Sequence, residues 1–297
     1  MRGGGALHNA RMRTALALLA VALPATSAAQ WRLDADLARA YDDNLSRAQR
    51  ESDVVRDHAL ALRGALGRGF VVAGGDLVLR AEARAARFDD FLGLDHAALG
   101  AGAAWRRKLG LGLTAPWLAA DAAYFGEDYS EPLRDGSRAA LALELGKRFT
   151  TAFEASLSLA YDRRWQSDDL GTVPGISGKP FSLRGRSLSL RGSFAFGEKL
   201  LAFGAVAARH GDVVSSSRRN QQIFREAAAI APDPAFGPDY IAYKLTGAST
   251  DSYTLGLSWA LGTRASLDAA LTSERTSARG GLDYDANVYS VSLVYRD

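Results

Sequence analysis

The sequence contains no cysteine, so a disulfide framework and metal sites built from thiolates are excluded. After its N-terminal segment it also lacks any run of about 18 consecutive apolar residues, roughly the length that a membrane-spanning helix requires. If this chain enters a membrane, it must therefore do so as a closed β-barrel, in which neighbouring strands satisfy all backbone hydrogen bonds.

The chain also lacks a large surplus of either positive or negative charge. The 297 residues include 36 Lys and Arg against 33 Asp and Glu. The first 29 residues contain Arg2, Arg11 and Arg13 but no acidic residue, so the rest of the chain has 33 basic and 33 acidic residues. Without a positive surplus, the sequence offers no electrostatic basis for binding nucleic acid.

The N-terminus shows the three parts of a secretory signal peptide. A basic start is followed by a short apolar stretch at residues 14–23, and Pro24 ends that stretch. The small residues Ser27, Ala28 and Ala29 then offer a cleavage site. We expect residues 1–29 to be a cleaved signal peptide and residues 30–297 to be the exported domain.

Strict alternation of apolar and polar side chains is the main evidence in the sequence for β-strands. In residues 253–261 the apolar set is Tyr253, Leu255, Leu257, Trp259 and Leu261. A period of two places every second side chain on one face of a sheet. The same alternation predicts twelve strands, at residues 31–41, 60–72, 77–84, 99–105, 118–124, 139–145, 153–165, 188–196, 201–207, 253–261, 266–274 and 289–295.

This repetition predicts an all-β fold, a transmembrane antiparallel up-and-down β-barrel of about 12 strands (10–14), apolar toward lipid and polar toward its lumen. Short and long connections alternate, which predicts short periplasmic turns and long extracellular loops. The longest loop is expected at about 211–249, with a short helix within 221–231. Residues 240–245 keep the strand phase and extend the strand that follows.

The chain resembles the outer-membrane β-barrel proteins of Gram-negative bacteria over residues 30–297. Its last strand, residues 289–295, is similar to the C-terminal signal that the barrel-assembly machinery reads. Residues 41–47 resemble a stretch of uncharacterised porin-like proteins and of the barrel domain of surface lipoprotein assembly modifiers. The helical-repeat domain of those modifiers is absent from this sequence. The resemblance implies an outer-membrane location and the assembly machinery as a partner.

Charged residues in the inward phase are the first candidate functional set. They are Arg32, Asp34, Asp36, Arg63, Arg80, Glu82, Arg84, Asp121, Arg138, Glu144, Arg148, Glu154, Asp162, Arg164, Arg191, Asp268 and Glu274. The two signs nearly balance, whereas a pore selective for one ion sign usually shows an excess of one charge. We expect arginine–carboxylate ladders in a narrow or plugged lumen with weak charge selectivity. Purely structural bridging is the alternative.

Acidic residues follow several odd-numbered strands and form the second set. They are Asp42, Asp43, Asp89, Asp90, Glu127, Asp128, Asp168, Asp169 and Asp212. Such oxygen ligands suit Ca²⁺ or Mg²⁺, so one hypothesis is an acidic collar at the extracellular rim that binds these cations. The other is a solvated rim that keeps the loops soluble. We expect no other cofactor.

Three histidines could indicate a lipid hydrolase. His58 shares the lipid-facing phase, while His96 and His210 are expected in the lumen phase, yet no recognisable catalytic pattern surrounds them. Trp117 also has the inward phase and could contact a carbohydrate.

We expect a monomeric, non-enzymatic small porin for passive solute passage, in contact with outer-membrane lipid and lipopolysaccharide. A non-conducting barrel that displays its loops is the alternative from a different class, and a lipid hydrolase is the third.

Overall fold

The computed structural model describes residues 31–169, 171, 173–279 and 281–297. The predicted signal peptide, residues 1–29, lies outside the described residues. No helix in the part of the chain that is described is long and apolar enough to span a membrane.

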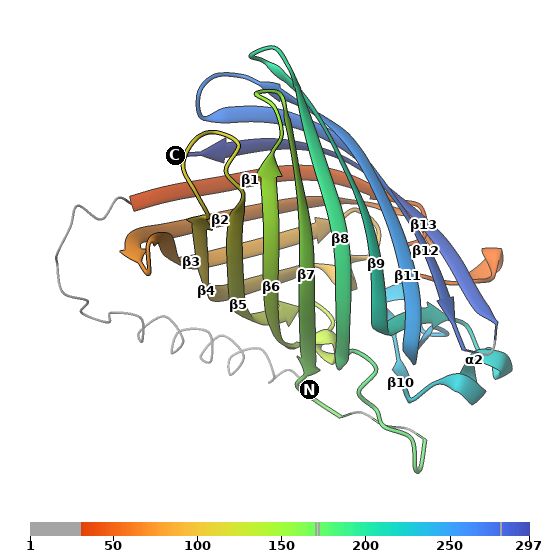
Figure 1. The fold of residues 1–297 in the computed structure, drawn as a ribbon. Coiled ribbons are helices and arrows are strands. Elements are labelled where there is room, and N and C mark those ends of the chain that lie inside the picture. The colour runs from red at the N-terminus through yellow and green to blue at the C-terminus, as the bar shows by residue number, and fades with distance from the viewer. Residues whose placement is uncertain (1–30, 170, 172, 280) are drawn as a thin grey trace. The chain divides into compact units, whose positions relative to one another are not determined.

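Twelve long strands form one closed antiparallel sheet (Figure 1). Their bounds are β1 (Trp31–Asp42), β2 (Asp57–Val72), β3 (Gly75–Phe88), β4 (His96–Lys108), β5 (Trp117–Tyr129), β6 (Gly136–Arg148), β7 (Phe153–Gln166), β8 (Leu183–Phe196), β9 (Leu200–Ser217), β11 (Ile241–Ala260), β12 (Ala265–Ala278) and β13 (Leu282–Arg296). Each strand pairs with its neighbours in the chain, and β1 pairs with β13 to close the sheet. The predicted twelve-stranded up-and-down barrel is therefore confirmed, including the strand at residues 77–84.

The outer surface of the barrel is apolar. Cross-strand pairing sets apolar residues opposite one another, as in the pairs of Leu143 with Leu159 and of Leu255 with Leu271. The exposed fraction is 56% for Leu143 and 71% for Leu255. Large apolar side chains exposed in a continuous belt need an apolar surrounding. This surface therefore suits a lipid environment, and the opposite face of the same strands forms the lumen wall.

The predicted phase of the ninth strand is wrong. Alternation in residues 201–207 predicts that Leu201, Phe203, Ala205 and Ala207 face lipid, but Phe203 pairs with Gly256 on the lumen face of β11. A methyl group added at Gly256 would lie 2.3 Å from the Phe203 ring, so this glycine makes room for the ring. β9 is apolar on both faces near Phe203, and alternation alone therefore could not fix its phase. In the observed phase Arg209 faces inward, and His210, predicted in the lumen, faces outward.

The two ends of the barrel differ in their connections. We name the end that carries Trp31 and Arg296 the terminal end; its connections are residues 73–74, 109–116, 149–152, 197–199 and 261–264. The opposite end, the loop end, has the connections 43–56, 89–95, 130–135, 167–182, 218–240 and 279–281. Assigning these ends to periplasm and exterior stays a prediction.

The loop-end connections contain the remaining regular elements. These are η2 (Glu51–Asp53), η3 (Leu92–Leu94), η4 (Pro132–Arg134), α2 (Gln221–Glu226), β10 (Ala229–Pro232) and η5 (Pro234–Phe236). The helix α2 lies where a short helix was predicted. The predicted loop 211–249 is too long, because β9 continues to Ser217 and β11 begins at Ile241.

Glycines on the lumen face make room for large rings, and one of them gives a stability test. A methyl group at Gly146 would lie 2.0 Å from the ring of Trp117, whereas one at Gly64 would meet nothing within 4 Å. Overpacking costs roughly 1–3 kcal/mol, so Gly146→Ala should lower unfolding stability in detergent by about that amount. Gly64→Ala, on the lipid face of β2, is the control and should not destabilise. Equal urea midpoints for the two variants would contradict the packing.

Candidate functional site

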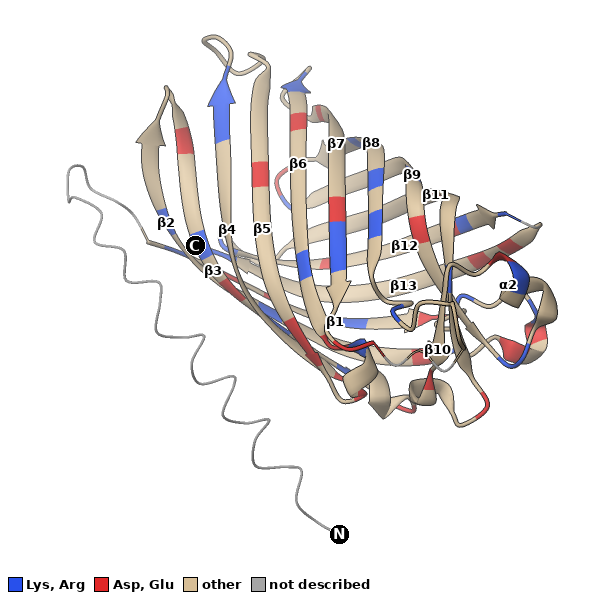
Figure 2. Cartoon of the chain, turned by 90° about the horizontal axis from the view of Figure 1, so that it is seen from below, with Lys and Arg blue, Asp and Glu red and all other residues tan. Residues whose placement is uncertain are grey.

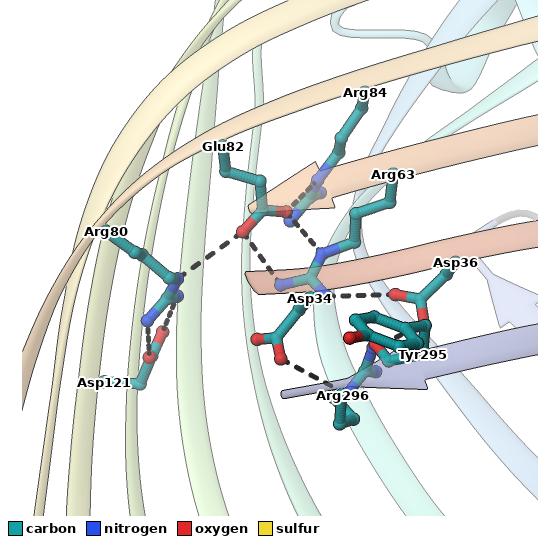
Figure 3. Close-up of polar contacts among 9 residues, drawn as sticks. All are labelled: Asp34, Asp36, Arg63, Arg80, Glu82, Arg84, Asp121, Tyr295 and Arg296. Atoms are coloured by element: carbon teal, nitrogen blue, oxygen red, sulfur yellow. Dashed lines mark hydrogen bonds and ion pairs between the residues drawn. The ribbon is translucent and has the colours of Figure 1, made fainter. Parts of the chain in front are cut away.

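Charged side chains on one side of the lumen form a continuous network (Figure 3). It extends over β13, β1, β2, β3 and β5, and its members are Asp34, Asp36, Arg63, Arg80, Glu82, Arg84, Asp121 and Arg296. The network contains as many arginines as carboxylates. Positive and negative residues are interspersed along the strands elsewhere as well (Figure 2).

Glu82 on β3 is the centre of this network. Its side chain is 1% exposed and receives hydrogen bonds from Arg63 Nε at 2.7 Å and from Arg84 Nε at 2.6 Å. Arg63 Nη2 donates a second bond at 3.0 Å, and Arg80 Nε lies 3.4 Å from the same carboxylate. A buried carboxylate is stable only when it is paired and hydrogen-bonded. The three guanidinium groups meet that requirement together.

Arg80 reaches past a neighbouring strand. It makes two hydrogen bonds to Asp121 on β5, at 2.7 and 3.0 Å, although β4 lies between the two strands. Gly102 on β4 makes this possible, because a methyl group there would lie 3.0 Å from the Arg80 guanidinium. This bidentate pair is the geometry that arginine prefers with carboxylates.

The network also closes the seam of the barrel. Asp36 on β1 accepts from Arg63 of β2 at 3.0 Å and from Arg296 of β13 at 2.7 Å. Arg296 Nε lies 3.9 Å from Asp34. These contacts link the first and last strands through side chains in addition to their backbone ladder.

The other predicted lumen residues also lie on the inner face but form smaller contacts. Arg148 pairs with Glu154 at 3.2 Å, and Asp268 accepts hydrogen bonds from Ser258 and Ser266. The remaining pairs are Arg164 with Glu127, Asp162 with Arg209 and Glu274 with Arg47. Four of the predicted lumen residues form no ion pair within the described part of the chain, namely Arg32, Arg138, Glu144 and Arg191.

The loop end of the lumen is bridged by the connection 218–240, which we call the crossing segment. It leaves from β9 and returns to β11, yet Ala235 and Phe236 pack on Leu94 in the connection between β3 and β4. Around the closed sheet of twelve long strands, β3 and β4 are the strands farthest from β9 and β11, so they lie on the opposite side of the barrel. The backbone approach is close, because a methyl group at Gly93 would lie 2.8 Å from Ala235. The crossing segment therefore spans the opening of the lumen at the loop end, which we call the mouth.

A buried ion pair fastens the crossing segment. Asp233 is fully buried and contacts Arg134, of η4, at 2.6 Å. Ser216 at the end of β9 donates a 2.5 Å hydrogen bond to the same carboxylate. The Arg134 guanidinium also lies 4.4 Å from the Phe181 ring. We call Arg134 and Asp233 the latch; neither residue was among the functional residues predicted from the sequence.

The connection 43–56 folds over the mouth from the other side. Ser46 accepts a 2.8 Å hydrogen bond from the Ser216 backbone, and Arg218 lies 3.0 Å from Asp53. Asn44 donates a 2.8 Å bond to the backbone of Asp285 on β13. This connection therefore holds the crossing segment in place at a second position.

The predicted acidic collar does not form a preassembled cation site. Among the described residues, no three metal-ligating side chains are grouped for a metal ion. Asp42 accepts from Arg47 at 2.8 Å, Asp43 from Asn287 at 2.8 Å, and Asp169 from Gly178 at 3.0 Å.

The other collar residues are also separate from one another. Arg39 binds Asp89 through both guanidinium nitrogens and lowers the pKa of this carboxyl. Glu127 pairs with Arg164. Asp90, Asp128, Asp168 and Asp212 lie at the same end of the barrel. Cation binding at this rim stays a prediction.

The histidines and Trp117 are dispersed. His58 lies on the outer face beside Tyr41, and His96 faces inward and stacks on Tyr129. His210, expected in the lumen, faces outward, with Nδ1 3.5 Å from Ser249 Oγ. Among the described residues, no carboxylate forms a hydrogen bond with this ring, so it lacks the orienting partner that a catalytic base usually has. Trp117 faces inward but is buried against Gly146.

No protein-family model and no curated protein matches the chain. It is similar to a solved outer membrane channel from Pseudomonas putida F1, with 10% identity, 92% of this chain and 97% of that chain covered, and a TM-score of 0.57. It is also similar to the NanC porin, with 8% identity, coverages of 88% and 98%, and a TM-score of 0.45. The translocator domain of the autotransporter NalP from Neisseria meningitidis gives 11% identity, coverages of 98% and 96%, and a TM-score of 0.42.

The chain has the fold of an outer-membrane β-barrel. At such low identity the likeness concerns the fold, and the exposed belt of leucines adds the physical reason for a membrane location. The predicted outer-membrane location is thereby confirmed. For this barrel, the inner wall with its network and the bridged mouth is the candidate functional site.

Proposed function

We propose that the barrel is a passive channel for small solutes whose loop end is closed by the crossing segment in the conformation described. The observation that carries this proposal is a charged inner wall that solvent reaches. Arg84 and Asp121 face the lumen of a closed barrel, yet their side chains are 43% and 41% exposed. Eight strands give an interior that side chains can fill, and wider barrels leave room for ligands or water.

The similar structure from Pseudomonas putida F1 is described as an outer membrane channel, and this supports the proposal. The balance of charges in the network favours weak selectivity between anions and cations. We therefore assign small solutes of either sign, or of none, as the substrate class.

A non-conducting barrel that presents its loops is the second candidate. The crossing segment and its buried latch favour it, because a permanently closed mouth would block solute passage. The two candidates differ in whether the crossing segment can leave the mouth.

Planar-bilayer recording tests the proposal. The mature barrel is expected to give discrete current steps, mostly in a closed state, with similar anion and cation permeability in a KCl gradient. Insertion is verified by detergent extraction of the protein from the same bilayers. If neither the inserted wild type nor a variant without the latch carries current, the barrel does not conduct.

A further inference from the structure

Three arginines form an unpaired basic cluster on the outer face near the loop end. Arg163 lies on β7, and Arg184 and Arg186 lie on β8; all three are exposed. The register sets Arg163 directly opposite Arg184, and Tyr161 opposite Arg186. Because Tyr161 belongs to the apolar outer face, the three arginines point away from the lumen. We call them the outer arginine cluster.

Other outward arginines near this end have carboxylate partners. Arg39 binds Asp89, and Arg275 lies 3.9 Å from Asp285. None of the three clustered arginines forms an ion pair with any described residue. Like charges directly opposite each other destabilise a sheet. The cluster therefore favours an anion that the chain itself does not supply.

The depth of the cluster identifies the region of the membrane it meets. Arg163 lies between Tyr161 and Trp165 on the same face of β7. Exposed Tyr and Trp side chains of membrane proteins lie at the level of the lipid headgroups. The arginines therefore lie where lipid phosphate groups are.

An apolar groove on the outer surface leads to this cluster. It has a volume of about 660 Å³ and follows a row of paired residues across the strands. The row consists of Ala103, Ala122, Leu141, Tyr161 and Arg186. The small alanines beside the larger Leu and Tyr side chains create the hollow. A ligand that fits both parts has an anionic head and a hydrocarbon chain.

We propose that the outer arginine cluster and this groove bind a phosphorylated lipid, lipid A of the outer leaflet. Its phosphate groups accept hydrogen bonds from the guanidinium groups, which match phosphate in a bidentate geometry. One acyl chain lies in the groove. Lipid A is assigned because the loop end is predicted to face outside and because its paired phosphates suit several adjacent arginines.

Native mass spectrometry of the purified full barrel in detergent, with added lipid A, tests the proposal. The variant Arg163→Gln/Arg184→Gln/Arg186→Gln is expected to bind lipid A at least about tenfold more weakly than the wild type. The matched control Arg39→Gln/Arg87→Gln/Arg275→Gln removes the same number of outward arginines. Those arginines lie near carboxylates, Arg87 being 3.9 Å from Asp95. The control should bind like the wild type, and circular dichroism verifies that both variants are folded.

Two further experiments distinguish the contribution of the lipid phosphate groups from that of the acyl chain. Didephosphorylated lipid A should bind at least about tenfold more weakly to the wild type, and Ala122→Trp should weaken lipid A binding with all arginines intact. Inorganic phosphate should not displace bound lipid A at equal concentration. Unchanged binding by the triple variant, or an equal loss in the control, would overturn the proposal.

Discussion

Replacing Asp233 with asparagine is expected to open the loop end of the barrel. The substitution removes the charge of a fully buried carboxylate and leaves Arg134, which is 14% exposed, without its partner. Breaking a buried ion pair on one side costs roughly 3–5 kcal/mol, and about 1.4 kcal/mol is a tenfold change in an equilibrium constant. The balance between open and closed mouths should shift by roughly a hundredfold or more toward the open state.

Single-channel recording measures this shift as the fraction of time spent in the open state. Arg56→Gln is the matched control, because Arg56 pairs with Glu51 at the same end but the two side chains are 54% and 81% exposed. Exposed pairs contribute about 0–1 kcal/mol, so the control should behave like the wild type. If Asp233→Asn keeps the wild-type open fraction while Ser216 and Arg134 remain ordered, the crossing segment does not gate the lumen.

Replacing Glu82 with glutamine should have the second large effect, on stability and on ion selectivity together. Arg63, Arg80 and Arg84 would lose their shared buried carboxylate. The cost expected for one-sided loss of a buried charge is roughly 3–5 kcal/mol. The lumen would also gain net positive charge, which favours anions.

Two measurements check the effect of Glu82→Gln. The temperature at which the barrel unfolds in detergent should fall, and the reversal potential in a KCl gradient should move toward the chloride potential. Glu144→Gln is the control, because Glu144 faces the lumen without an ion pair among the described residues. It should shift selectivity slightly and leave the unfolding temperature unchanged. Equal destabilisation by the two variants would show that the network contributes no special stability.

The fold could be predicted because its strands are polar on one face and apolar on the other. In β7, Leu157 and Leu159 alternate with Ser156 and Ser158, so the sequence determines which side chains face lipid. In β9 both faces are apolar around Phe203, and only the pairing with β11 decides which one meets lipid. The predicted inward orientation of His210 depended on that phase, and it failed for this reason.

The lumen network could be predicted in part. Arg80, Glu82 and Arg84 share a face because they are two residues apart along one strand. Their partners depend on register, and the contact of Arg80 with Asp121 depends on Gly102. The alternation of apolar and polar residues predicts neither the strand register nor the space that a glycine leaves for a neighbouring side chain.

The latch could not be predicted from the sequence for a different reason. Arg134 and Asp233 are 99 residues apart, and both lie in connections without periodicity. One signal was available, since Asp233 stands between the apolar residues Ile230 and Phe236. An isolated acid in an apolar stretch is expected to need a buried partner.

The seam between β1 and β13 has a consequence for biogenesis. Because β13 follows every other strand of the sheet in the sequence, one edge of β1 has no partner until β13 has been made. We therefore expect closure to be a late event, after which Arg296 contacts Asp34 and Asp36. A chain cut short before this strand would leave one edge of β1 and one edge of β12 unpaired, and we expect such a chain to aggregate.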